Sequence, residues 1–221
     1  LLPKIESYVS VISAVYFYGA GCAFPEKNMI VEQAIAQYIP VNIEIRSDLW
    51  AAVRALCQRQ PGIACILGTG ANSCQYDGNK IINQVSPLGF ILGDEGSGAV
   101  LGKRLVSDLF KNQLSEELKE KFQNQYGITA ADVIENVYRK PFPRRYLASL
   151  SKFCAENIEN PLIAHLVYDH FDYFAKRILP QYPALPVGFT GSIAYYYQDV
   201  LKQVLADNGF QVGNILQSPM A

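Results

Sequence analysis

The sequence predicts an α/β protein with a mostly parallel sheet and helices on its faces. Short runs rich in Val, Ile and Leu alternate with segments whose apolar residues recur every three or four positions. Three of the runs end in a small or polar turn placed directly before such a helical segment. A strand–turn–helix order that repeats in this way is typical of a parallel sheet covered by helices.

Composition limits the functions that fit. The chain has 221 residues, half of them hydrophobic, which suits one large domain or two small ones. The net charge of −1, with scattered basic residues, argues against nucleic acid as a partner. No apolar run reaches the roughly 18 residues of a membrane span. Five cysteines without a C-x-x-C pair and two histidines five positions apart favour neither a disulfide framework nor a metal site.

We therefore expect a reduced, cytoplasmic protein. The sequence shows no initiator Met and no signal peptide, and it ends abruptly, so we also expect it to be a fragment.

The first part of the chain alternates strands and helices. We predict strands at 9–18, 41–45 and 63–67 and helices at 25–38 and 49–57. The strand at 9–18 should be buried on both faces. It ends at Gly19, where the backbone could approach a ligand or simply turn tightly. Asp48 follows the second strand, where it could be an ordinary helix cap or a ligand-facing group at the sheet edge.

Glycines mark the end of the strand at 63–67. Gly68 and Gly70 flank Thr69, forming a turn whose backbone N–H groups could hold a phosphate. The dipeptide Asp77-Gly78 then predicts a β-hairpin.

A second glycine cluster spans 93–97, with the sequence GDEGS. We predict that Asp94 and Glu95 open a helix, because the helix dipole favours acidic residues in a first turn. Gly96 and Gly98 would each cost about 1 kcal/mol in that helix. They therefore suggest that a backbone segment or a ligand packs closely there.

The remainder is predicted to be largely helical from 115 to 180, with Thr129 beginning one helix and another at 146–156. We expect a final buried strand at 185–189, a glycine turn at Gly191-Ser192, a helix at 194–205 and a closing strand at 212–216. The turn resembles the first one and could receive an anion or a nucleotide at the helix start.

These motifs together resemble the N-acetylglucosamine kinase and BadF/BadG-type ATPase family of the actin-like ATPase and sugar kinase superfamily. The resemblance rests on G-T-G-x-N at 68–72, G-D-E-G-S at 93–97 and G-S at 191–192, in the family's order. It implies two ribonuclease-H-like lobes around a cleft, with the N-terminal lobe incomplete in this chain. We place the lobes at 1–61 and 62–221, and leave open a return of the last residues to the first lobe.

The resemblance also implies roles for individual residues. Asp48 matches the catalytic aspartate, which acts as general base for transfer of the ATP γ-phosphoryl group to the 6-hydroxyl of an amino sugar. The candidate sugar-binding residues are Asn72, Asp94, Gly89 and Gly19. The candidate nucleotide-binding residues are Gly68, Thr69, Gly70, Gly191 and Ser192. The implied cofactors are ATP and Mg²⁺, and the implied substrate is a small sugar.

The sequence departs from the family pattern in two places. The superfamily's first phosphate loop is absent, so we expect the chain as given not to turn over ATP. Ser86-Pro87-Leu88 stands where some relatives have Gly and Trp before Gly89, which leaves the identity of the sugar open.

Two other functions stay open. One is an ATP-driven activator of a partner enzyme, although such relatives bind an iron–sulfur cluster through cysteines, whereas Cys65 and Cys74 are predicted core residues. The other is a non-catalytic sugar or nucleotide sensor, against which the presence of Asp48 argues. A homodimer is compatible with the sequence, but no sequence feature decides the oligomeric state.

Overall fold

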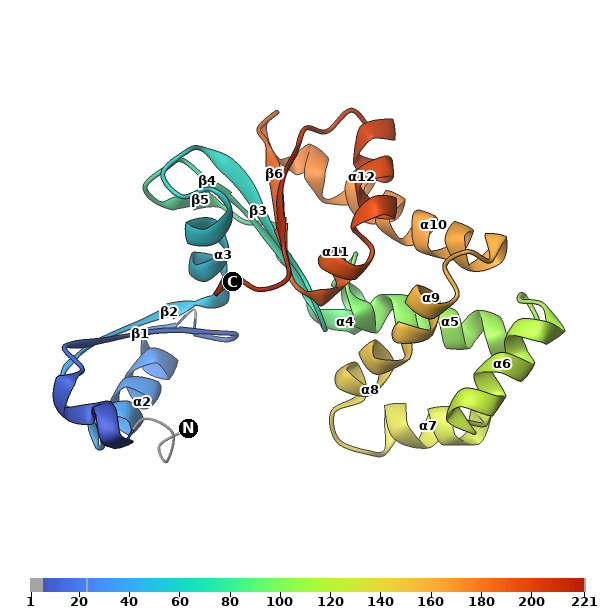
Figure 1. The fold of residues 1–221 in the computed structure, drawn as a ribbon, viewed down its shortest axis with the longest axis horizontal. Coiled ribbons are helices and arrows are strands. Elements are labelled where there is room, and N and C mark those ends of the chain that lie inside the picture. The colour runs from blue at the N-terminus through green and yellow to red at the C-terminus, as the bar shows by residue number, and fades with distance from the viewer. Residues whose placement is uncertain (1–5, 23, 221) are drawn as a thin grey trace. The chain divides into compact units, whose positions relative to one another are not determined.

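The structure is a computed structural model that describes residues 6–22 and 24–220 (Figure 1). The chain divides into two compact units, Leu1–Ala51 and Ala52–Ala221, which we call the N-terminal and C-terminal units. The division falls inside a helix, before the predicted lobe boundary at 61–62, which stays a prediction. Within the described residues, no helix is both long enough and apolar enough to span a bilayer.

The N-terminal unit contains a parallel strand pair. Its elements are η1 (Glu6–Val11), β1 (Ala14–Gly19), α2 (Pro25–Ala36), β2 (Asn42–Ser47) and the start of α3 (Asp48–Leu56). The carboxyl ends of the two strands lie together, because Gly19 is paired with Ser47.

The prediction of a strand over 9–18 that is buried on both faces is wrong. The first residues form η1, and the strand begins at Ala14. Tyr16 remains 59% exposed and Phe17 37% exposed. In the described residues β1 pairs with β2 alone, so little of the unit covers its apolar side chains.

The C-terminal unit contains a five-stranded sheet in the order β5-β4-β3-β6-β7. Its strands are β3 (Gly62–Leu67), β4 (Ala71–Tyr76), β5 (Ile81–Asn83), β6 (Val187–Thr190) and β7 (Val212–Leu216). The first three strands form antiparallel pairs, and β6 and β7 extend the sheet in parallel. This is the strand order of a ribonuclease-H-like lobe, as the family resemblance implied.

The sheet of this unit is mixed, whereas we expected a mostly parallel sheet. Strand β3 pairs antiparallel with β4 and parallel with β6. The hairpin at Asp77-Gly78 makes β4 and β5 antiparallel, and β6 follows only after a long helical segment.

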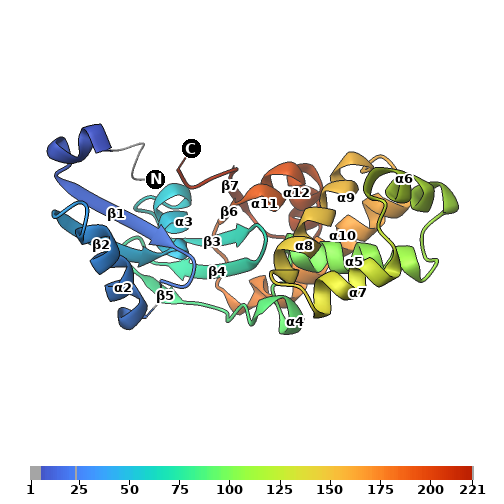
Figure 2. The ribbon, with the colours of Figure 1, turned by 90° about the horizontal axis from the view of Figure 1, so that it is seen from below.

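Helices cover the sheet and extend beyond the end at which β3 turns into β4 (Figures 1 and 2). They are α4 (Gly89–Leu92), α5 (Gly98–Phe110), α6 (Glu116–Tyr126), α7 (Ala130–Tyr138), α8 (Pro143–Leu150), α9 (Lys152–Glu156), α10 (Pro161–Arg177), η2 (Leu179–Gln181), α11 (Ser192–Tyr196) and α12 (Gln198–Asp207). The core lies between β3, β6, α5 and α10, where Leu67, Phe171 and Phe189 are fully buried.

Two predicted helices are each divided. The one at 146–156 is interrupted at Ser151, whose buried hydroxyl donates to the carbonyl of Ala148 at 2.7 Å. Such back-bonding competes with the helical ladder. The one at 194–205 is interrupted at Tyr197 and becomes α11 and α12.

The expectation that Asp94 and Glu95 open a helix is also wrong. Helix α5 begins at Gly98, and Ser97 is its N-cap, with its hydroxyl accepting from the N–H of Val100 at 3.2 Å. Asp94 instead lies in the preceding turn with a φ of 55°. The uncharged Ser97 hydroxyl bonds a free backbone N–H at the start of α5. Asp94 and Glu95 are therefore not needed as caps of this helix.

Candidate functional site

The turn between β3 and β4, residues 68–70, is held against the start of α5. The N–H groups of Gly98 and Ala99 donate to the carbonyls of Gly68 and Thr69 at 2.8 and 3.2 Å. Gly68 donates its own N–H to Gly70 at 2.9 Å. Within the described residues the N–H groups of Thr69 and Gly70 donate no hydrogen bond, so the turn has two donors available for an anion.

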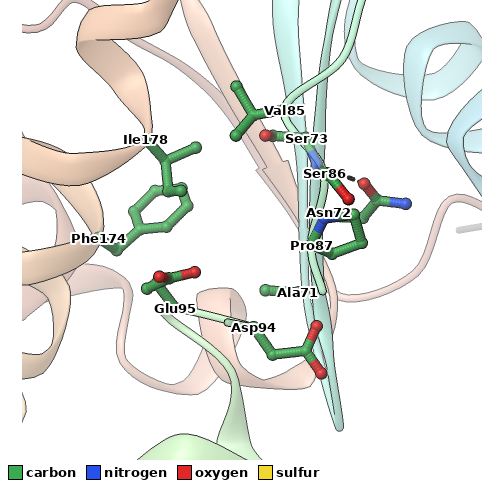
Figure 3. Close-up of a pocket in the computed structure, with 10 residues that line it drawn as sticks. All are labelled: Ala71, Asn72, Ser73, Val85, Ser86, Pro87, Asp94, Glu95, Phe174 and Ile178. Atoms are coloured by element: carbon green, nitrogen blue, oxygen red, sulfur yellow. Dashed lines mark hydrogen bonds between the residues drawn. The ribbon is translucent and has the colours of Figure 1, made fainter. Parts of the chain in front are cut away.

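The residues after this turn line a narrow pocket of about 10 Å³, room for about one water-sized group (Figure 3). Its walls are Ala71, Asn72, Ser73, Val85, Ser86, Pro87, Asp94, Glu95, Phe174 and Ile178. Phe174 of α10 and Ile178 directly after it lie on one side of the pocket, and Ser73 and Val85 lie on the other (Figure 3). The Asn72 amide points away from Phe174 and Ile178, to the other face of β4 (Figure 3).

Two hydrogen bonds fix the orientation of the Asn72 amide. Its Oδ1 accepts from the N–H of Ser73 and from Nε2 of Gln84, both at 3.0 Å. Because the oxygen is already engaged, the NH₂ group is the part left for a ligand, and Asn72 would act as a donor.

Asp94 is a buried carboxyl group with unused hydrogen-bonding capacity. Its side chain is 3% exposed, and its Oδ2 is buried and has no hydrogen-bond partner among the described residues. The nearest cation is Arg144, with Nη1 at 3.9 Å from Oδ2. Burial raises the pKa of this carboxyl, and the neighbouring Glu95 adds to that effect, while the Ala71 N–H and Arg144 oppose it. A ligand hydroxyl that donates to Asp94 would give the buried Oδ2 the hydrogen bond that it lacks.

Glu95, Phe174 and Ile178 line the pocket, although the sequence analysis assigned none of them to the site. Glu95 pairs with Arg177 of α10 at 2.8 Å. Phe174 and Ile178 are four positions apart, a helical spacing that is typical of core residues. No sequence signal separates a core residue from one that lines a pocket on the same helix face.

A second, larger pocket of about 700 Å³ lies on the other side of the turn. Gly68, Thr69 and Ser192 line it together with residues of α8, α9 and α11. Lys152 at its wall pairs with Glu156 at 3.0 Å, whereas Arg145 has no carboxylate partner in the described part of the chain. Tyr196 adds an aromatic surface that is 64% exposed.

Gly191 explains how the two glycine turns come together. A Cβ at this position would lie 2.4 Å from the carbonyl oxygen of Leu67 and 3.3 Å from the nitrogen of Gly68. Its φ of 116° also favours glycine. The end of β6 can therefore pack directly on the end of β3, which brings Ser192 beside Gly68.

The structure thus brings together most of the predicted site residues of the C-terminal unit. Asn72 and Asp94 line the narrow pocket, and Gly68, Thr69 and Ser192 line the larger one. Gly70 borders the narrow pocket, since its Cβ would lie 3.0 Å from Asp94. Gly89 begins α4 and does not line either pocket.

The remaining predicted residues belong to the N-terminal unit. Gly19 and Asp48 lie at one sheet edge, because Gly19 pairs with Ser47. Oδ1 of Asp48 accepts from the N–H of the next residue, Leu49, at 3.0 Å. A capping side chain usually bonds two or three residues ahead, so this geometry is not that of an N-cap. Burial raises the pKa of Asp48, opposed by backbone N–H groups.

The described residues contain no cluster of three or more His, Cys, Asp or Glu side chains that could hold a metal ion. Mg²⁺ in nucleotide sites is usually bound by substrate phosphates, waters and one or two carboxylates. We assign no residue of this chain to it.

Comparisons with known proteins place this architecture. No protein-family model matches the chain, and a search of curated proteins finds no match. A crystal structure of a protein from Porphyromonas gingivalis, provisionally assigned as an N-acetylglucosamine kinase, is 50% identical with a TM-score of 0.95, over 99% of this chain and 78% of that one.

Two more distant structures share the fold. A protein from Chromobacterium violaceum with the same provisional assignment is 18% identical with a TM-score of 0.68, over 89% of this chain and 70% of that one. The ethanolamine utilization protein EutJ from Carboxydothermus hydrogenoformans is 15% identical with a TM-score of 0.51, over 95% and 62% of the two chains. With half of its residues shared with the P. gingivalis protein over nearly its whole length, the chain belongs to the N-acetylglucosamine kinase family of actin-like ATPases.

Proposed function

We propose that this chain belongs to an ATP-dependent kinase that phosphorylates an amino sugar of the N-acetylglucosamine type at its 6-hydroxyl. One observation carries the proposal: a single turn, residues 68–70, leads directly into two pockets of different character. One is narrow, with a buried carboxylate, and the other is large, with a cation and an aromatic ring. Transfer between two substrates needs such adjacent sites.

The narrow pocket suits sugar hydroxyls. Asp94 is a buried acceptor and Asn72 presents an NH₂ donor, so the pair can bind neighbouring hydroxyl groups of one ring. The 50% identity to the provisionally assigned N-acetylglucosamine kinase supports an amino sugar as the substrate.

The larger pocket suits a nucleotide. Its volume of about 700 Å³ lies within the usual range for small-molecule sites. Arg145 could pair with phosphate oxygens, and Tyr196 could stack on a base. The N–H groups of Thr69 and Gly70 would then hold the phosphate nearest the sugar.

Asp48 is proposed as the general base that takes the proton of the 6-hydroxyl and orients its oxygen toward the γ-phosphorus. Its carboxylate accepts only local backbone hydrogen bonds in the structure, which leaves capacity for a substrate. Mg²⁺ would enter bound to ATP and neutralise charge on the transferred phosphoryl group.

The test is sugar-dependent release of ADP by the intact protein, measured over N-acetylglucosamine, glucosamine, N-acetylmuramic acid and glucose. Asp48→Asn should lower kcat by about 100-fold or more while leaving KM for sugar and ATP within about twofold. Asparagine preserves local hydrogen bonding at the helix start, and Glu26→Gln, on α2, serves as an exposed carboxylate control.

Full activity of Asp48→Asn would exclude the general-base role. ATP hydrolysis that needs a partner protein and ignores every sugar would contradict the kinase and favour an activator of another enzyme. Binding of sugar and nucleotide without turnover by the intact protein would favour a sensor.

A further inference from the structure

Tyr182 forms a hydrogen-bonded bridge behind the narrow pocket. It directly follows η2 and is 7% exposed. Its hydroxyl oxygen accepts from the N–H of Val85 at 2.9 Å and shares a 2.7 Å hydrogen bond with the hydroxyl of Ser73. One phenol group therefore links strand β4 to the segment that follows β5.

Both partners of Tyr182 line the narrow pocket, whereas Tyr182 itself does not. The opposite wall is formed by Phe174 and Ile178, which lie on the chain segment that leads through η2 to Tyr182 (Figure 3). The bridge thus connects the segment that carries one wall to the residues that carry the other.

We propose that Tyr182 is a positioning residue that sets the width of the narrow pocket and thereby determines which sugars it accepts. The inference rests on the proposed function, since it takes the narrow pocket as the sugar site. Without the hydroxyl, Val85 and the segment that contains Ser86 and Pro87 would no longer be tied to the α10 side. Sugar substituents would then meet a wall of variable position.

The bridge has a cost if it is broken on one side. Ser73 is 3% exposed, so its hydroxyl would be left buried without a partner if Tyr182 lost its own. Removing both hydroxyls leaves no side-chain hydroxyl at this place buried without a partner. Coupling between the two positions is therefore expected, because they share one hydrogen bond.

The chain supplies matched controls. The hydroxyl oxygens of Tyr126 and Tyr146 are buried and have no hydrogen-bond partner among the described residues. Tyr126→Phe and Tyr146→Phe therefore remove the same buried oxygen, from a partly buried ring, without breaking a bridge. They report what the loss of a phenol oxygen does by itself.

The experiment compares Tyr182→Phe, Ser73→Ala, the double variant and the two controls in the intact protein. Tyr182→Phe should raise KM for the preferred sugar about tenfold, which corresponds to about 1.4 kcal/mol, with kcat and KM for ATP within about twofold. The preference for that sugar over the next best one should fall. The double variant should change KM by less than the product of the two single effects. The controls should stay within about twofold.

An unchanged KM and unchanged sugar preference in Tyr182→Phe would overturn the inference. So would equal effects in the two control variants, which would indicate general loosening. If the wild-type protein phosphorylates no sugar, the proposed function fails. Amide hydrogen exchange then tests separately whether Tyr182 holds the pocket wall in place. Faster exchange of the Val85 N–H in Tyr182→Phe, with unchanged global stability, supports a positioned wall, and unchanged exchange excludes it.

Discussion

A buried histidine should make this protein lose stability as the solution is acidified. His170 on α10 is 2% exposed, and its Nε2 has no hydrogen-bond partner within the described part of the chain. Burial lowers its pKa from 6.5 to about 4, and the nearby Arg104 adds to the effect, while the backbone groups of Gly96 and Ser97 oppose it. The ring is therefore neutral in the folded protein at pH values where an unfolded chain binds a proton.

The size of the expected stability loss follows from the difference in proton binding between the folded and unfolded states. Between the folded pKa of about 4 and the unfolded value of 6.5, the unfolded state binds more protons, so stability rises with pH. The contribution of His170 is fully present above pH 6.5 and is lost as the pH falls toward 4. Between pH 7 and pH 5 the loss is about 2 kcal/mol.

The assay is urea unfolding at these two pH values for the wild type and for His170→Gln, whose side chain does not titrate. Carboxyl groups also titrate in acid, but they do so in both proteins. The free energy of unfolding should therefore fall by about 2 kcal/mol less in the variant than in the wild type. His165→Gln, at a side chain that is 75% exposed, is the control.

Equal pH dependence in the wild type and His170→Gln would refute the reasoning. It would mean that the imidazole is charged in the folded state, or that the helix opens locally enough to hydrate it. A large effect of His165→Gln would point to a different group altogether.

Two further changes test the site. Asp94→Asn should abolish sugar binding yet raise the free energy of unfolding at pH 7, because it removes a charge whose pKa is raised by burial. The gain should vanish in acid, where the aspartate is protonated as well. Calorimetry and urea unfolding check both effects, and a loss of stability at pH 7 would contradict the account. Gly191→Ala should cost about 2 to 4 kcal/mol, because its Cβ would collide with Leu67 at a φ of 116°. Gly209 has a φ of 75° and open space around it, so Gly209→Ala measures the cost of the backbone conformation alone. Equal losses of unfolding free energy in the two variants would show that the contact with Leu67 contributes nothing.

Local chemistry in the sequence predicts much of the fold. Asp77-Gly78 predicts the hairpin of β4 and β5, and the structure confirms it. Thr129 was predicted to start a helix, and it does so with a capping box in which Asp132 bonds back to the Thr129 backbone. Such features depend on residues that are close in sequence, so the chain itself contains the information needed to predict them.

Features that depend on tertiary contacts were not predictable. The start of α5 at Gly98 was missed because its first N–H groups are satisfied by carbonyls of the turn at 68–69, about 30 residues earlier in a different element. Phe174 and Ile178 were not assigned to the site, because their place in the pocket also depends on tertiary contacts. Helical spacing indicates which face is covered, but not whether a neighbour or a pocket covers it.

The glycines of the motifs were predicted to mark close approach by a backbone or a ligand, and in the structure they meet protein atoms. A Cβ at Gly93 would lie 2.1 Å from the carbonyl of Pro87, and one at Gly96 would lie 3.0 Å from Leu67. At Gly98 it would meet Ile193 at 3.0 Å. Close packing against the backbone of Pro87 and against the side chains of Leu67 and Ile193 therefore accounts for these glycines without a ligand.

This packing has a chemical consequence for the turn at 68–70. It uses the carbonyls of Gly68 and Thr69 and the N–H of Gly68 in internal hydrogen bonds. The N–H groups of Thr69 and Gly70 are what remains, and no side chain stands on Gly70 to obstruct them. The glycine motifs thus act indirectly: they allow three chain segments to pack so closely that the only donors left unbonded in the turn lie between the two pockets.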